Sequence, residues 1–289
     1  MRHSKRAFAV AALFCSLAAA AQPVAKLAPR NGVVRLAVVG DAGDGTIRVA
    51  RGLARVHAEH PLDGVLLPGD NLYPCGAKSA DDPVWQRLQP LFDLALPMFP
   101  ILGNHDWCGN PDAELAYSAR LGLWRFPARE YMVESGVADI AMIDTTPYVR
   151  GKGKAPDLVS MFAGSRARWR IVTGHHTIVS SGFHGYFPRR EHRRMLALLA
   201  PMRAAGVDLY VCGHDHHLEL VGGNPRMLIS GASSDPIAPL ALHPNTLFPA
   251  DAQKRGGFAV LEISASKLSV TFYDLEGKRL AAPLEWTKK

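Results

Sequence analysis

The chain has 289 residues, of which 48% are hydrophobic and 20% charged, and its formal net charge is +7. This composition is typical of a globular protein, and the length allows one large domain or two small ones. No repeat, low-complexity tract or Ser- or Gly-rich linker is present. The basic residues are scattered and lie in no nucleic-acid motif, so no nucleic-acid partner is expected, although the charge suits an anionic substrate.

The first 21 residues predict a signal peptide. A positive segment is followed by an apolar run over residues 7–18 and by a small-residue cleavage site at Ala19-Ala20-Ala21. The apolar run is shorter than the roughly 20 residues that a membrane span needs. We therefore expect export to the periplasm or the medium, cleavage before Gln22, and no membrane attachment of the mature chain. Cleavage would lower the net charge to about +4, because it removes Arg2, Lys5 and Arg6.

The first third of the chain alternates between predicted strands and helices. Short apolar runs predict strands over residues 33–40, 63–67 and 97–102. Helical spacing of apolar residues predicts helices over 46–60 and 83–95. This alternation is typical of a parallel sheet covered by helices.

The second half changes character. A hairpin about Gly136 is predicted over 130–135 and 137–144, followed by a strand over 169–173, a helix over 188–204 and a strand over 207–212. Four further strands without intervening helices favour antiparallel pairing. They are predicted over residues 217–221, 226–230, 257–264 and 267–273. The whole pattern predicts two sheets packed face to face, with helices outside.

Five predicted strands end in the same way, with an apolar run, a glycine and then a polar residue of a metal-ligand type. The carboxyl ends of strands are where sites assemble in α/β sheets, and glycine lets the backbone turn sharply there. A shell of oxygen and nitrogen ligands without thiolate suits two cations such as Fe, Mn or Zn. The polar residues that these strand ends would bring together are Asp41, Asp70, Asn104, His175, His214 and His216.

These strand ends resemble the motifs of the calcineurin-like metallophosphoesterase superfamily over residues 33–231. Tyr73 makes the chain similar to the purple acid phosphatases, of the small single-domain type of tartrate-resistant acid phosphatase. The resemblance implies one metallophosphoesterase domain over residues 22–289, with a four-layer α/β/β/α sandwich of two mixed sheets. The motifs that carry it are VVGDAG, PGDNLY, LGNHD, TGHH and CGHDHH.

The resemblance also implies the ligands of two metal ions. Fe(III) would be held by Asp41, Asp70, Tyr73 and His216. A divalent ion (Fe, Zn or Mn) would be held by Asp70, Asn104, His175 and His214. Asp70 would bridge the two ions through its two oxygens, since a carboxylate can serve two metals. A phenolate is a hard anionic oxygen that suits a trivalent ion.

The function implied is hydrolysis of phosphate monoesters of small substrates by in-line attack of a metal-bound hydroxide. A phosphodiesterase or nucleotide hydrolase on the same scaffold is the alternative, and a non-catalytic metal or phosphate binder is a rival of another class. Nothing in the sequence specifies the oligomeric state.

Two histidines outside the ligand set are candidate catalytic residues. His105 directly follows Asn104, and His184 lies nine residues after His175, where the family carries a pocket histidine. The alternative for His184 is a solvated loop residue. Plant-type members have a second histidine after this one, where the chain has Gly185.

Three cysteines follow the predicted signal peptide. Cys75 and Cys108 each follow a ligand loop, and both loops must meet at the metal-bearing edge. In an oxidising compartment a disulfide between them is expected, with two separate thiols as the alternative. Cys212 lies in a predicted buried strand and is interpreted as a small core residue.

Overall fold

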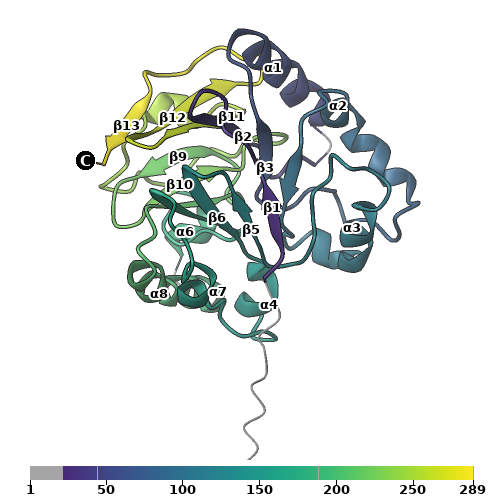
Figure 1. Ribbon diagram of the computed structural model, residues 1–289, viewed down its shortest axis with the longest axis horizontal. Helices are drawn as coiled ribbons and strands as arrows, with labels where there is room; N and C mark the ends of the chain where they lie inside the picture. The colour runs from purple at the N-terminus through teal and green to yellow at the C-terminus, as the bar shows by residue number, and fades with distance from the viewer. Residues whose placement is uncertain (1–21, 44, 188, 289) are drawn as a thin grey trace, which may run out of the picture.

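The computed structural model describes residues 22–43, 45–187 and 189–288. The predicted signal peptide, residues 1–21, lies outside the described residues. Two sheets make up the centre of the molecule, one with six strands and one with seven (Figure 1). The predicted α/β architecture with two mixed sheets is therefore confirmed.

The six-stranded sheet has a parallel half and an antiparallel half. Strands β2 (Val33–Val38), β3 (Gly64–Leu67) and β4 (Met98–Pro100) pair in parallel. Strand β11 (Gly257–Ser264) pairs with β2 in the opposite direction, and β12 (Lys267–Asp274) and β13 (Leu284–Thr287) continue the antiparallel half. Helix α1 (Thr46–Glu59) connects β2 to β3 and forms the crossover that parallel neighbours need.

The seven-stranded sheet has the order β1-β5-β6-β7-β8-β10-β9. Strands β6, β7, β8 and β10 are parallel neighbours, whereas β5 and β9 pair antiparallel at either side of them and β1 pairs in parallel with β5. The bounds of these strands are β1 Val24–Lys26, β5 Tyr131–Glu134, β6 Ala138–Met142, β7 Trp169–Thr173, β8 Leu209–Cys212, β9 Leu218–Val221 and β10 Arg226–Ser230.

Helices lie on the outer side of each sheet. Helices α1, α2 and α3 lie beside the six-stranded sheet, and α4, α7 and α8 lie beside the seven-stranded one (Figure 1). The remaining short helices lie in loops. The bounds are α2 Gln89–Phe92, α3 Pro111–Tyr117, α4 Thr145–Val149, α5 Leu158–Met161, α6 Phe183–Tyr186, α7 Arg190–Ala197, α8 Leu199–Ala204 and α9 Ala250–Gln253, with 3-10 helices η1 Pro83–Leu88 and η2 Asp106–Cys108.

Strand β8 shows how the layers are built, because its side chains alternate between two hydrophobic cores. Leu209 and Val211 belong to the large core that lies between the two sheets. Tyr210 and Cys212 point to the opposite face and pack in a second core with residues of α7 and α8 such as Met202. Both faces of this sheet are therefore covered, which explains why β8 is apolar without interruption.

Two predicted helices are interrupted, and proline accounts for both. The segment predicted as one helix over 188–204 forms α7 and then α8, with the break beside Leu198. Pro201 cannot donate the backbone hydrogen bond that would continue α7. The segment over 83–95 forms η1 followed by the single turn of α2, and Pro90 stands at their junction.

The antiparallel pairing predicted for the later strands is confirmed for β9–β10 and β11–β12. The other edge of β10 pairs in parallel with β8, a strand outside that prediction. Strands β1 and β13 escaped prediction because neither is a buried apolar run: their residues are exposed or half-buried, and each strand contains a charged residue.

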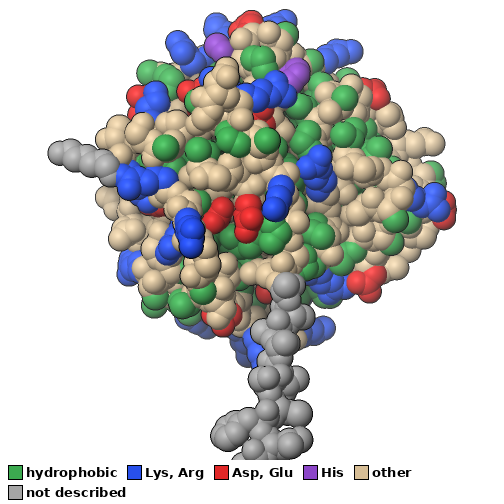
Figure 2. All heavy atoms as spheres, in the orientation of Figure 1, with side chains coloured by type: hydrophobic (Ala, Val, Ile, Leu, Met, Phe, Trp, Pro, Cys, Tyr) green, Lys and Arg blue, Asp and Glu red, His purple; other side chains and the backbone are tan. Residues whose placement is uncertain are grey.

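The described surface carries scattered charge. Lys and Arg side chains are spread over the face shown in Figure 2, with Asp and Glu among them. Among the described residues, no helix combines the length and the apolar character that crossing a membrane requires.

Cys75 and Cys108 form a disulfide across 33 residues of sequence, which confirms the predicted pairing. Cys75 lies in the loop after β3, and Cys108 ends η2 in the loop after β4. The bond therefore ties together two loops that leave the same edge of one sheet. Cys212 is a buried free cysteine.

Replacement of both bonded cysteines, Cys75→Ser with Cys108→Ser, is expected to lower the free energy of unfolding by about 3 kcal/mol, because the unfolded chain gains the entropy of an open loop. Denaturant unfolding of the oxidised proteins measures the loss. Reductant should destabilise the wild type and leave the double variant unaffected. Peptide mapping that finds the two cysteines unlinked in unreduced protein would contradict the prediction.

Candidate metal centre

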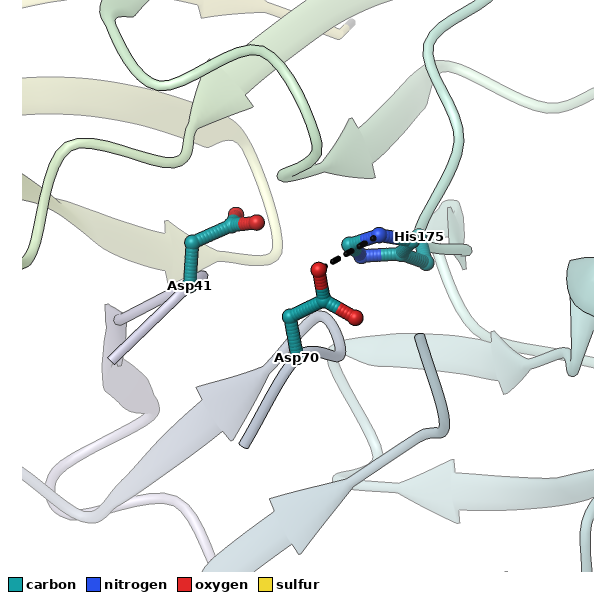
Figure 3. A group of neighbouring side chains, drawn as sticks. All are labelled: Asp41, Asp70 and His175. Carbon is teal, nitrogen blue, oxygen red and sulfur yellow. Dashed lines mark ion pairs between the residues drawn. The ribbon is translucent and has the colours of Figure 1, made fainter. Parts of the chain in front are cut away.

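The five glycine-containing strand ends meet at one edge of the molecule. Asp41 and Asp70 follow β2 and β3 of the six-stranded sheet, whereas His175 follows β7 of the opposite sheet. Figure 3 shows the two carboxylates and the imidazole turned toward a common centre. The three side chains are buried, and atoms of a type that binds metals lie within 4.8 Å of one another.

One group of side chains surrounds the hydroxyl of Tyr73. Its oxygen lies 3.3 Å from Asp41 Oδ1, 3.1 Å from Asp70 Oδ2 and 3.2 Å from His216 Nε2. His216 Nε2 also lies 3.4 Å from Asp41 Oδ1. These are the four side chains predicted to share one cation.

A second group surrounds Nε2 of His175. This atom lies 3.1 Å from Asn104 Oδ1, 3.1 Å from His214 Nδ1 and 3.4 Å from Asp70 Oδ2. These are the four side chains predicted to share the other cation. The structure thus brings all seven predicted ligands into two groups with Asp70 in common.

The contacts of Asp70 differ from the sequence expectation in one respect. Oδ2 faces both groups, whereas Oδ1 accepts a hydrogen bond of 2.8 Å from the backbone N–H of His105. The sequence expectation is that each oxygen faces one ion. A single oxygen is available to both groups, because the other fixes the loop after β4.

Asp41 divides its oxygens in the same way. Oδ1 faces Tyr73 and His216, whereas Oδ2 accepts a hydrogen bond of 2.9 Å from the backbone N–H of His214. This bond joins the two sheets, because His214 follows β8 of the seven-stranded sheet. Each buried carboxylate therefore positions a neighbouring strand end as well as presenting one oxygen to the centre.

The backbone is strained at this edge. Asp41, Asp70 and His214 have φ angles of +54°, +52° and +69°, in the left-handed region that residues with a side chain rarely occupy. Each such conformation costs about 1–3 kcal/mol and persists where surrounding contacts enforce it. The hydrogen bonds of the two carboxylates supply that enforcement.

Glycine is required at two of the strand ends by close approach. A Cβ atom on Gly103 would collide with Oδ1 of Asp70, and one on Gly213 would collide with Oδ2 of Asp41. These oxygens accept the hydrogen bonds from the backbone N–H groups of His105 and His214. The glycine in each motif therefore leaves room for a carboxylate.

The orientation of two imidazoles is fixed by backbone carbonyls. Nδ1 of His175 lies 2.9 Å from the carbonyl of Pro68, and Nδ1 of His216 lies 3.0 Å from that of Asp235. A carbonyl can only accept, so each Nδ1 carries the hydrogen and donates it. The neutral ring then presents the lone pair of Nε2 to the centre, as a metal ligand must.

Without a cation, the buried charges strongly perturb one another. Burial alone would lower the pKa of His175, but Asp70 raises it to about 10. Burial likewise opposes charge on His216, but its bond to Asp41 raises the pKa to about 9. Burial followed by repulsion from neighbouring histidines lowers the pKa of His214. Burial and the nearby carboxylates raise the pKa of Tyr73.

The two predicted catalytic histidines stand at the rim. Nδ1 of His105 lies 2.7 Å from the carbonyl of Pro74, and its Nε2 lies 4.0 Å from Asp70 Oδ2. The ring of His184 packs on that of His214 with centroids 3.8 Å apart, and burial lowers the pKa of His184. Both histidines line a cleft of about 480 Å³ together with Asp70, Asn104, His214 and His216.

Two acidic residues next to the proposed ligands bind loop backbone. Asp106 accepts hydrogen bonds from the N–H groups of Asn71, Leu72 and Gly103. Asp215 accepts them from His184 and Gly185, and so fixes the loop that carries His184.

A sixth strand end contributes to the site and escaped the sequence analysis. After β6, Asp144 caps α4 by accepting from the N–H of Thr146. Thr145 Oγ1 accepts from the N–H groups of His175 and His176, at 3.3 Å each. This strand end lacks glycine, so it does not fit the pattern of an apolar run followed by glycine and a polar residue. An Asp-Thr-Thr sequence after an apolar strand is a helix N-cap signal that could have found it.

Comparisons with known proteins identify the family of the chain. The sequence profile of the calcineurin-like phosphoesterase family matches residues 34–218. The chain belongs to the calcineurin-like phosphoesterase family. Within the family it is 31% identical to purple acid phosphatase 4 of Arabidopsis thaliana, over 86% of this chain and 83% of that protein. It is 27% identical to tartrate-resistant acid phosphatase type 5 of Homo sapiens, over 80% and 81%.

Solved structures of the phosphoesterase fold are similar over most of the chain. GAP50 of Plasmodium, described as the anchor in the inner membrane complex, has a TM-score of 0.74 at 25% identity and 89% coverage of both chains. The purple acid phosphatase PPD1 of Lupinus luteus has a TM-score of 0.68 at 15% identity, over 88% of this chain and 54% of that one. The family match and the purple acid phosphatase relatives confirm the predicted enzyme class, a metal-dependent phosphoric-ester hydrolase.

The carboxyl of Asp144 should give the folding stability a measurable pH dependence. Burial raises its pKa from 3.8 to about 6, so the unfolded chain loses this proton first as the pH rises. The folded state therefore loses stability between about pH 4 and pH 6, by about 2–3 kcal/mol. Asn at this position has no such proton.

Denaturant unfolding at pH 4 and pH 7 of the wild type and of Asp144→Asn tests this prediction. The wild type should lose about 2–3 kcal/mol relative to the variant over that interval. Parallel pH profiles of the two proteins would contradict it.

Proposed function

We propose that this chain is an exported binuclear metallophosphatase that hydrolyses phosphate monoesters. The observation that carries the proposal is the pair of ligand groups that share Oδ2 of Asp70. One group is built around Tyr73 Oη and the other around His175 Nε2. A shared carboxylate oxygen between two such groups is the arrangement that a two-metal site needs.

The residues present fit two cations. Ligand atoms about 2.1 Å from one ion lie about 3.0–3.4 Å apart at tetrahedral or octahedral angles. Within each group, the neighbouring atoms lie 3.1–3.4 Å apart. His175 Nε2 and His214 Nδ1 face each other at 3.1 Å, and two neutral rings could satisfy both lone pairs through one cation.

The identity of the ions follows from the donor types. The phenol of Tyr73 with the carboxylates of Asp41 and Asp70 makes a hard, anionic oxygen set that suits Fe(III). The group of Asn104, His175 and His214 is neutral apart from Asp70, and so suits a divalent ion such as Fe, Zn or Mn. The raised pKa of Tyr73 means that the phenol stays protonated until a cation displaces the proton.

The reaction is the transfer of a phosphoryl group to water. A water oxygen bonds to phosphorus while the bond from phosphorus to the ester oxygen breaks, and the leaving oxygen takes up a proton. The products are an alcohol and inorganic phosphate. The two ions, when bound, would polarise the phosphate and lower the pKa of the attacking water.

His105 and His184 are the residues placed to hold the proton for the leaving oxygen. Both line the cleft, and neither belongs to the two ligand groups. Because Pro74 holds the Nδ1 hydrogen of His105, Nε2 is the atom that faces the centre. The lowered pKa of His184 means that it carries a proton to donate mainly in acid, which accords with an acid phosphatase.

A diester or nucleotide substrate on the same scaffold is the nearest alternative function, as the sequence already suggested. A non-catalytic role deserves comparison as well, because GAP50 is described as an anchor. The complete double set of donors around Asp70 supports catalysis over a purely structural role. The predicted signal peptide over residues 1–21 supports export to the periplasm or the medium.

Iron-loaded protein should be coloured, because a phenolate on Fe(III) gives a charge-transfer band in the visible. Tyr73→Phe should abolish the band, and the absorption spectrum measures it. Tyr186→Phe is the matched control, since this exposed tyrosine lies on the loop of His184 and should leave the band in place. Colourless iron-loaded wild type would refute the Fe(III)–Tyr73 assignment while leaving the phosphoesterase assignment intact.

The substrate class is tested by steady-state kinetics on a nitrophenyl phosphate monoester and the corresponding bis-ester. We expect kcat/KM to be at least about tenfold higher for the monoester, because its third free oxygen and its second negative charge let the phosphate face both groups of ligands. Faster cleavage of the bis-ester would establish the phosphodiesterase alternative instead.

A further inference from the structure

One wall of the catalytic cleft is made of large apolar side chains that are open to solvent. Ile237 is 59% exposed and Leu240 is 53% exposed, and both line the cleft with Phe183. Ile237 and Leu240 belong to the segment over residues 235–247, and Phe183 precedes the candidate catalytic residue His184. Apolar side chains gathered at a cleft indicate a surface that becomes covered by a ligand or partner.

This wall is fixed to the metal-bearing loops by backbone hydrogen bonds. The N–H of Ile237 donates to the carbonyl of His216 at 2.7 Å, and the N–H of Leu240 donates to the carbonyl of Ser181 at 3.0 Å. The N–H of His243 donates to Ser181 Oγ at 2.8 Å. The apolar side chains therefore hold a set position relative to the ligand His216, as a specificity wall requires.

Ser181 is itself anchored by a buried acid. Glu219 on β9 accepts hydrogen bonds from the N–H and the hydroxyl of Ser181 and, at 2.6 Å, from the hydroxyl of Thr246. His217 Nε2 lies 3.0 Å from the same carboxylate. One buried carboxylate thus joins the His184 loop, the apolar segment and the strand behind them.

The charge of the cleft argues against a second anionic group on the substrate. Among the described residues that line it, none is lysine or arginine. Recognition of a second phosphate or a carboxylate ordinarily uses such cations. The polar side chains of the lining are those of the proposed ligands, their neighbours and the two candidate catalytic histidines.

We infer that the cleft selects phosphate monoesters whose leaving group carries an apolar alkyl or aryl body, which packs on Ile237, Leu240 and Phe183. This inference rests on the proposed phosphatase function. The phosphate end faces the two groups that share Asp70, and the apolar body extends from the ester oxygen along the wall. The cleft volume of about 480 Å³ lies within the range of pockets that take drug-sized ligands.

The test compares ethyl, butyl and hexyl phosphate, below the concentration at which any of them forms micelles. Their alcohols are nearly equally acidic, so differences in rate report contact with the leaving group. Full burial of one methylene contributes about fourfold, and a wall covers only one side of the chain. We expect kcat/KM to rise about tenfold from ethyl to hexyl phosphate.

The variant Ile237→Ser with Leu240→Ser should reduce this tenfold ratio to about twofold. The matched control is Leu242→Ser with Leu247→Ser, which removes two leucines of the same segment that are 49% and 44% exposed and do not line the cleft. In the control variant, the ratio of kcat/KM for hexyl phosphate to that for ethyl phosphate should stay about tenfold. An equal fall in both variants would overturn the inference, because it would show a general effect of the segment.

The outcomes separate this inference from the proposed function. If metal-loaded wild type hydrolyses all three esters with the same kcat/KM whatever the length of the alkyl chain, the inferred contact with the apolar wall is overturned, whereas the proposed phosphatase function still holds. Metal-loaded protein that hydrolyses no monoester, the nitrophenyl ester included, overturns the proposed function itself.

Discussion

The candidate metal centre depends on the hydrogen bonds of Asp41 and Asp70, each of which uses its two oxygens differently. Each carboxylate binds a backbone N–H with one oxygen and presents the other to the centre. The bond from His214 to Asp41 crosses from one sheet to the other, as does the contact of Asp70 with His175. The left-handed conformations at this edge, and the glycines that leave room for the carboxylates, are consequences of this arrangement.

The same arrangement concentrates ionisable groups in a buried place. Two carboxylates, a phenol and three imidazoles gather at this edge, each within about 3.4 Å of at least one other. The pKa values of Tyr73, His175 and His216 are raised, whereas those of Asp70 and His214 are lowered. Such a set is costly to bury without counter-charges, whereas two cations would satisfy the anionic oxygens and the histidine lone pairs together. The floor of the cleft therefore suits phosphate and metal, while the wall at Ile237 and Leu240 suits an apolar body.

The local sequence pattern predicts the position of a site residue where that position depends on a single strand. The strand ends before Asp41, Asp70, Asn104 and His214 could be read from an apolar run and a glycine, because parallel strands place their carboxyl ends at one edge. The pattern failed at Thr145, whose strand end lacks glycine although its hydroxyl holds the backbone at His175. It also failed for α7 and α8, where helical spacing concealed the effect of Pro201.

By itself, the sequence determined the class of fold and the residue types of the centre, because these follow from periodicity and motif. It predicted a disulfide between Cys75 and Cys108 from loop position, with two separate thiols as the alternative, and the tertiary structure decided for the disulfide. Only the tertiary structure decided which oxygen of Asp70 faces both groups, since this depends on the N–H of His105 reaching Oδ1 from another strand. It also decided that Ile237 and Leu240 form a wall, because their positions are set by hydrogen bonds to His216 and Ser181. Contacts between segments distant in sequence leave no local sequence pattern, and these contacts orient the side chains of the site.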